Sequence, residues 1–240
     1  RRVQDIRTKE ISHDQIHYAN NLRTVSHPQL SGGKPTDLCN PELHQLYQSL
    51  LGAVAYLSHT RMDVAPFICA LQRHTHSPTL LHMRNLNKLL LWVQRNPKKL
   101  WYRKFTTSGD QRVEAGNIKT HLRTVSDAAF RKDTEDGYSL RGAVFCRGAG
   151  QSAEAFAGKS TVVHVIDWAC RSQRHVTRST FSAELLGGGD AIDHGILLSH
   201  LLHELEVGPL TAAEARSRRM LGGYIPLALY VDAKSVYAAV

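Results

Sequence analysis

The sequence lacks the features that mark secreted, zinc-binding and membrane-spanning proteins. Its 240 residues include four cysteines, and no two of them have the Cys-x-x-Cys spacing of a zinc site. The cysteines lie far apart, so free thiols in a reducing compartment fit better than a disulfide framework. No apolar run approaches the roughly 18 residues of a membrane helix. The N-terminus has neither the apolar stretch of a signal peptide nor a Met, so we expect the chain to start inside a longer polypeptide.

Acidic residues are scarce relative to basic ones. The chain has 30 Lys and Arg against 21 Asp and Glu, which gives a formal net charge of +9. A basic surface attracts polyanions, because phosphates that it neutralises release their counterions. Nucleic acid is therefore the favoured partner, although charge alone leaves acidic proteins and membrane surfaces open. Apolar residues make up 42% of the chain, enough for a hydrophobic core and one or two domains.

Helical periodicity dominates residues 41–100. Residues 1–40 are mixed and polar, and the stretch at 31–35 reads as a linker or exposed loop. Asn40-Pro41 is a helix start, followed by apolar residues at helical spacing to Leu57. We expect a second helix capped by Asp63 and a third opened by Ser77-Pro78 and stopped before Pro97. These three form a small helical subdomain.

The pattern changes to strands after about residue 100. Strands are predicted at 121–126, 138–146, 162–169 and 227–231, with a long helix at about 180–204 between the last two. Gly187-Gly188-Gly189 inside that helix indicates a kink, a break or close packing on the sheet, and the sequence leaves this choice open. Residues 207–224 look like an insertion. The expected fold class is α/β, with a mixed sheet preceded by the helical subdomain.

Three acidic residues lie at the ends of predicted strands or near the start of the long helix: Asp127, Glu184 and Asp232. Asp127 and Asp232 follow predicted strands, and Glu184 lies in the first turns of the long helix. Two divalent ions can stabilise both oxygens of an in-line phosphodiester hydrolysis, and such hard ions prefer carboxylates. Each acid also has a plain structural reading: a turn residue, an acid at a helix dipole and a helix cap, respectively.

An ordered set of short segments carries a family resemblance: residues 47–58, 60–64, 76–93, 126–130, 136–139, 168–173, 179–185 and 230–235. In this order they resemble the polymerase–ribonuclease H region of copia-type retrotransposon Pol polyproteins. The resemblance implies that 1–40 is the end of a polymerase palm with its linker, that 41–100 is the thumb or connection, and that 101–240 is a ribonuclease H-like domain. It also implies an intracellular location, in cytoplasmic virus-like particles or the nucleus.

The same resemblance assigns the chemistry. Asp127, Glu184 and Asp232 correspond to metal-binding acids that hold two Mg²⁺ ions, or Mn²⁺, and hydrolyse the RNA strand of RNA·DNA hybrids. Expected partners are the hybrid, a primer–template duplex and the rest of the polyprotein, with no membrane. The family's paired polymerase aspartates are absent, so this chain should not polymerise DNA alone. The family's fourth metal-facing residue lies beyond the third acid, so we expect an incomplete C-terminus. A catalytically inactive nucleic-acid-binding remnant is the alternative.

Other candidate contacts are basic. Arg171, Gln173, Arg174 and Arg178 lie between the third strand and the long helix, where they are suited to hold a phosphate backbone, although a solvated face is equally consistent. Lys98 and Lys99 lie among aromatic residues that also favour nucleic acid. His200, His203 and Glu204 lack the order of a zinc motif, and we expect them to be solvated.

Overall fold

The computed structural model describes residues 1–105, 120–129, 139–149, 163–173, 175–220 and 225–238. The chain divides into two compact units, residues 1–102 and 103–240. None of the described helices combines the length and the apolar character that a membrane span requires.

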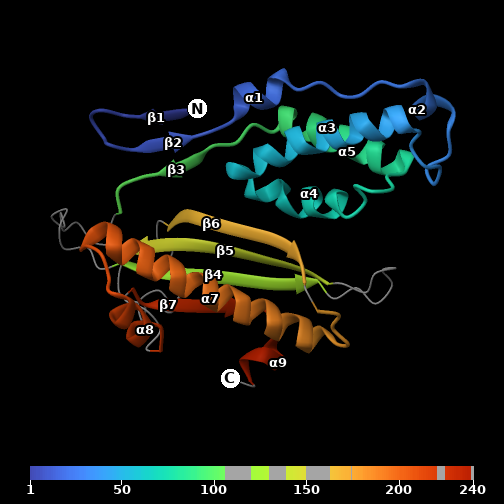
Figure 1. The fold of residues 1–240 in the computed structure, drawn as a ribbon. Coiled ribbons are helices and arrows are strands. Elements are labelled where there is room, and N and C mark those ends of the chain that lie inside the picture. Colours follow the sequence, from blue (N-terminus) through green and yellow to red (C-terminus); the bar gives the residue numbers. More distant parts are fainter. Residues whose placement is uncertain (106–119, 130–138, 150–162, 174, 221–224, 239–240) are drawn as a thin grey trace. The chain divides into compact units, whose positions relative to one another are not determined.

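The first unit combines a small sheet with a helical core. Strands β1 (Arg2–Gln4), β2 (Ile11–His13) and β3 (Leu100–Tyr102) pair antiparallel in the order β1-β2-β3. The unit's helices are α1 (Ile16–Asn21), α2 (Pro28–Gly32), α3 (Pro41–Ala55), α4 (Ala65–Gln72) and α5 (Leu80–Arg95), with 3-10 turns at Tyr56–His59 and Met62–Val64 (Figure 1). Residues 1–40 thus fold into the same unit as the helices, and part of the expected 31–35 linker belongs to α2.

Helix α3 begins where the sequence predicts. The Asn40 side chain accepts a hydrogen bond from the Leu43 N–H at 2.8 Å, and Pro41 occupies the first helical position. The predicted apolar residues of α3 are buried with α5 residues in one hydrophobic cluster, where Tyr47 is fully enclosed, except for Leu46, which is exposed. Burying such a stripe stabilises a helix more than its intrinsic propensity does.

Two helix starts differ from the expectation. Asp63 caps no helix: it lies in the 3-10 turn, where it bonds the Arg61 guanidinium at 2.9 Å and Lys98 at 3.0 Å. The α-helical segment, α4, starts at Ala65 with Val64 at its N-cap. The third helix, α5, starts at Leu80 rather than at Ser77-Pro78, because Thr79 and the His82 side chain form a capping box there.

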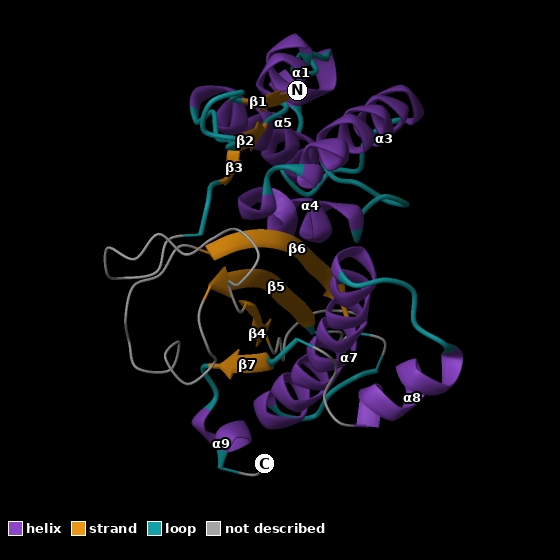
Figure 2. Cartoon of the chain, turned by 90° about the vertical axis from the view of Figure 1, so that its left-hand side faces the viewer, coloured by secondary structure: helices purple, strands orange, loops and turns teal. Residues whose placement is uncertain are grey.

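The second unit is a four-stranded mixed sheet with helices. Strands β4 (Thr120–Ala129), β5 (Leu140–Ala149) and β6 (Val163–Ser172) are antiparallel neighbours, and β7 (Leu227–Val231) joins the other side of β4 in parallel. Helix α7 (Thr180–Glu206) makes the crossover between β6 and β7 and packs across the sheet (Figures 1 and 2). Helices α8 (Ala212–Met220) and α9 (Lys234–Tyr237) follow, so the described part of the 207–224 insertion contains a helix.

The glycine run of α7 lies in an unbroken helix, which rules out a break. Gly187 and Gly195 face the sheet and are buried. A Cβ at Gly195 would lie 2.8 Å from the Leu227 side chain, and one at Gly187 would lie 3.5 Å from that of Ala128. Within the run, Gly187 and Gly188 are buried on the sheet side and a Cβ at Gly189 would have no described atom within 4 Å, so the run packs on the sheet at ordinary distance and the closest approach is at Gly195, outside it.

Candidate metal centre

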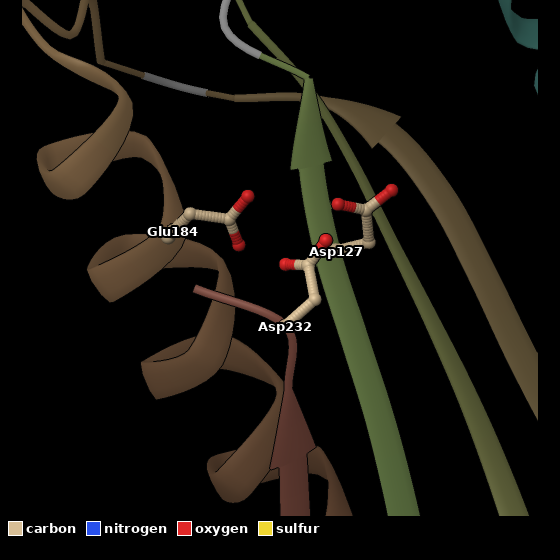
Figure 3. A group of neighbouring side chains, drawn as sticks. All are labelled: Asp127, Glu184 and Asp232. Atoms are coloured by element: carbon tan, nitrogen blue, oxygen red, sulfur yellow. The ribbon is translucent and has the colours of Figure 1, made fainter. Parts of the chain in front are cut away.

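Asp127, Glu184 and Asp232 come together at one edge of the second unit's sheet. One carboxylate oxygen from each residue lies within 4.8 Å of the others (Figure 3). Ser126 pairs with Val231 in the parallel register of β4 and β7, so the next residue on each strand is one of the two aspartates. Helix α7 brings Glu184 to the same place. In the described part of the chain this is the one group of His, Cys, Asp or Glu residues that could hold a metal ion.

Glu184 is the buried member of the group. Its side chain is 3% exposed, whereas Asp127 and Asp232 are exposed. The Ala128 backbone N–H donates to Glu184 Oε1 at 3.1 Å, while Oε2 is buried without a hydrogen-bond partner. Burial raises the pKa of Glu184 above its ordinary value, the Ala128 bond lowers it, and the Asp127 and Asp232 carboxylates raise it further. An unpartnered buried carboxylate beside two others is unfavourable unless a cation joins them.

The plain structural readings do not describe these acids. Asp127 lies inside β4, which continues to Ala129, so it is not a turn residue after the strand. Glu184 is one turn into α7, past the first-turn positions that favour acids. Asp232 directly follows β7, but α9 has Ala233 at its N-cap and no side-chain capping bond. Removing these alternatives leaves the convergence of the three carboxylates unexplained by local structure.

The donor set suits a hard divalent cation. All three side chains offer carboxylate oxygens, which Mg²⁺, Ca²⁺ and Mn²⁺ accept and which soft metals disfavour. Two strands and a long helix hold the donors, so little reorganisation is needed on binding. The residues present therefore fit a Mg²⁺ or Mn²⁺ ion.

The arginines predicted to contact nucleic acid in this unit are exposed where the structure describes them. Arg171 is exposed near the end of β6 and lines a pocket of about 390 Å³ together with Arg141 and His175. Two other lining residues adjoin the acids: Gly142 pairs with Asp127, and Gly187 lies one turn beyond Glu184. Arg178 is exposed just before α7, and Arg174 lies outside the described residues.

Gln173 does not fit its predicted role as a surface contact. Its side chain is 3% exposed, and its Nε2 donates to the carbonyl oxygen of Ala183 at 2.6 Å. A side chain enclosed in this way has little surface to offer a nucleic-acid backbone. The structure places it instead between β6 and α7.

Lys98 and Lys99 belong to the first unit and have acidic partners there. Lys98 Nζ lies 3.0 Å from Asp63, and Lys99 Nζ lies 3.8 Å from Asp14. The Lys98 ammonium is also 5.8 Å from the centre of the Trp92 ring. Nucleic-acid contact by these lysines stays a prediction.

His200 and His203 belong to no candidate metal-binding group among the described residues.

Sequence reasoning missed two parts of this region. Arg141 lines the pocket and pairs with Asp190 of α7, and the Ala128 N–H holds Glu184. Neither stands out in the sequence, because both roles depend on strand register and on how α7 docks. The hydrophobic period of a strand gives its faces but not its pairing partner.

The fold and the three acids define a mixed α/β unit with a candidate carboxylate metal centre. Two curated proteins are similar to the chain in sequence. The retrovirus-related Pol polyprotein from transposon RE1 of Arabidopsis thaliana is 26% identical over 180 residues, which is 75% of this chain and 10% of that protein. The corresponding polyprotein from transposon RE2 is 27% identical over 138 residues, which is 58% of this chain and 8% of that protein. No protein-family model matches, and no solved structure gives a significant match.

These similarities support a retrotransposon Pol polyprotein as the class to which the chain's sequence points. The chain spans about a tenth of the length of the curated relatives it matches. It is thus comparable to a segment of such a polyprotein, as its ordered motifs predict.

Proposed function

We propose that this chain is a segment of a copia-type reverse transcriptase–ribonuclease H, and that its second unit hydrolyses the RNA strand of RNA·DNA hybrids. The observation that carries the proposal is the convergence of Asp127, Glu184 and Asp232 within 4.8 Å, with one oxygen of Glu184 buried and unpartnered. The ordered motif resemblance and the similarity to transposon Pol polyproteins support the same assignment.

The three acids divide the work of holding the metals. Asp127 and Asp232 present exposed carboxylates, which leaves room on their solvent side for a phosphodiester. Glu184 closes the site from the α7 side, and the Ala128 N–H fixes its Oε1 while Oε2 is left available. Two bound Mg²⁺ ions would stabilise the attacking and the leaving oxygen of the hydrolysis. Mn²⁺ has the same preference for oxygen ligands.

The substrate's backbone would be held by the basic residues near the acids. Arg171 and Arg141 line the pocket beside Gly142, and Arg178 is exposed before α7. Guanidinium groups bind phosphate oxygens with two hydrogen bonds, which positions a strand without reading its bases. Choice of the hybrid would then rest on helix shape and the RNA 2′-hydroxyls.

The first unit is proposed to bind the primer–template duplex. By the family's order, residues 1–40 would end the polymerase palm and 41–100 would form the thumb or connection that contacts the primer–template. Exposed Lys and aromatic side chains near its end, including Lys98 and Trp101, are consistent with this role.

The test is a cleavage assay with the full chain, Mg²⁺ and an RNA·DNA hybrid labelled separately on each strand. Cleavage of the RNA strand alone, abolished by EDTA and by Asp127→Asn, is the expected result. Salt-sensitive binding of the hybrid without any cleavage would instead support the inactive nucleic-acid-binding alternative. Equal cleavage by wild-type and Asp127→Asn protein would show that the activity does not come from this site.

A further inference from the structure

One buried amide joins the end of β6 to the turn of α7 that bears Glu184. Gln173 directly follows β6, and its backbone N–H donates to the Ser139 carbonyl at 2.8 Å. Ser139 is itself fully buried and immediately precedes β5. The backbone of Gln173 is therefore fixed to the sheet before its side chain makes any contact.

The side chain of Gln173 reaches from this fixed point to the helix. Its Nε2 donates to the Ala183 carbonyl at 2.6 Å, and both residues are buried. Ala183 immediately precedes Glu184. A helix carbonyl has two lone pairs, so it can accept this bond in addition to the one from its own helix.

These bonds close a circuit through the metal centre. Glu184 Oε1 accepts from the Ala128 N–H of β4 at 3.1 Å. Ala129, the next residue of β4, pairs with Leu140 of β5, which follows Ser139. The circuit thus runs from Gln173 to Ala183 and Glu184, across to β4, back through β5 and Ser139, and returns to Gln173.

We propose that Gln173 is a positioning residue that sets where the Glu184 carboxylate lies relative to Asp127 and Asp232. It acts through the Ala183 carbonyl and touches neither metal nor substrate. The inference rests on the proposed function only in that divalent metal is one of its readouts. The positioning role requires a side chain that reaches from the end of β6 to the Ala183 carbonyl and carries an N–H donor. Gln173 has both, as its hydrogen bond to that carbonyl shows.

The test compares Gln173→Met with Thr177→Val in the full chain. Met keeps the length of Gln but cannot donate, whereas Thr177→Val removes a different buried bond of the same connection, the one at 3.0 Å to the Ser139 hydroxyl. We expect Gln173→Met to raise the half-saturating Mg²⁺ concentration about tenfold, because sub-ångström misplacement of a site group is costly. Thr177→Val should leave the half-saturating Mg²⁺ concentration unchanged, even if it lowers the Tm by as much as Gln173→Met does. Equal effects of the two variants, or none from Gln173→Met, would overturn the proposal.

Two metal-free measurements separate this inference from the proposed nuclease activity. Backbone hydrogen exchange at residues 183–188, with EDTA present, should be faster in Gln173→Met than in wild type and Thr177→Val. If Gln173→Met does not fold, the side-chain amide protons of Gln173 in wild-type protein are followed instead. Slow exchange of one of them supports the bond to Ala183, and solvent-like exchange of both refutes it. A wild-type chain that neither binds Mg²⁺ nor cuts hybrids would end the proposed function, while these exchange rates would still decide the role of Gln173.

Discussion

The backbone N–H of Ala128 donates to Glu184 Oε1 at 3.1 Å, which fixes a buried carboxylate of α7 against the strand that bears Asp127. The bond satisfies one oxygen of Glu184 and leaves the other buried without a partner. An ionised Glu184 therefore has an unpartnered buried oxygen beside two other carboxylates, and either a proton or an added cation can relieve this, so stability, pH and metal binding should be linked at this residue.

Glu184 should make the metal-free protein less stable as pH rises. Its pKa in the folded state is raised above the ordinary value of 4.5, so the folded state binds the proton more tightly than the unfolded state. Its contribution to stability is therefore fully present below about pH 4.5 and is lost as pH rises through the folded-state pKa. The measurement is the difference in Tm between wild type and Glu184→Gln, in EDTA, across this range. We expect the difference to shift in favour of the variant with rising pH, and a pH-independent difference would contradict the account.

Asp232→Asn should stabilise the protein without metal and abolish stabilisation by metal. The substitution removes one of the charges that repel Glu184, whose pKa both aspartates raise. In EDTA we expect a Tm equal to or above that of wild type. Addition of about 10 mM Mg²⁺ should raise the Tm of wild type but not that of Asp232→Asn, because a ligand stabilises the state that binds it. Asp193→Asn, an exposed acid farther along α7, is the matched control and should behave as wild type. A Mg²⁺ response retained by Asp232→Asn would exclude that residue from the site.

Gly195→Ala and Gly189→Ala should change stability in opposite directions. An added Cβ at Gly195 would lie 2.8 Å from the Leu227 side chain and 3.2 Å from the Thr124 hydroxyl. An added Cβ at Gly189 would have no neighbouring atom within 4 Å among the described residues. We expect Gly195→Ala to lower the free energy of unfolding by about 1–3 kcal/mol through overpacking. Gly189→Ala should raise it by about 0.5–1 kcal/mol, because Ala favours the helix. Urea denaturation measures both. Stabilisation by Gly195→Ala would mean that α7 does not pack this closely on the sheet.

Arg171→Ala should weaken hybrid binding while leaving Mg²⁺ affinity intact. Arg171 is exposed and lines the same pocket as Gly142, the strand partner of Asp127. It is suited to one phosphate contact, so its loss should reduce the salt slope of binding by about one unit. Arg216→Ala, an exposed arginine of α8, serves as the control for loss of general charge. Fluorescence anisotropy at several salt concentrations provides the slope. If both variants lose the same affinity, the pocket makes no specific contact.

Local sequence signals predicted the parts of the structure that depend on neighbouring residues. The start of α3 follows from Asn40 and Pro41, whose capping bond involves only the next turn. Asp63 was predicted to cap in the same way, but the Arg61 and Lys98 cations bind it instead, and Lys98 is far along the chain. Cap prediction fails where a distant charge competes for the side chain.

The candidate site was predictable as a set of residues but not as a geometry. The order of Asp127, Glu184 and Asp232 along the predicted strands and helix, with the flanking motifs, was enough to select them. The buried amide of Gln173 was not recognised, because its partner Ala183 becomes a neighbour only when α7 folds back on the sheet. The Ala128 bond to Glu184 depends on the same docking.

Asp127, Glu184 and Asp232 are proposed to bind divalent metal together. The most direct measurement is a titration of the metal-free chain with Mn²⁺, followed by electron paramagnetic resonance, in wild type and in Asp127→Asn, Glu184→Gln and Asp232→Asn. We expect saturable binding by wild type, competed by Mg²⁺ and weakened at least tenfold in each of the three variants. Saturable binding that all three variants retain, or no saturable binding by a folded wild-type chain, would contradict this proposal.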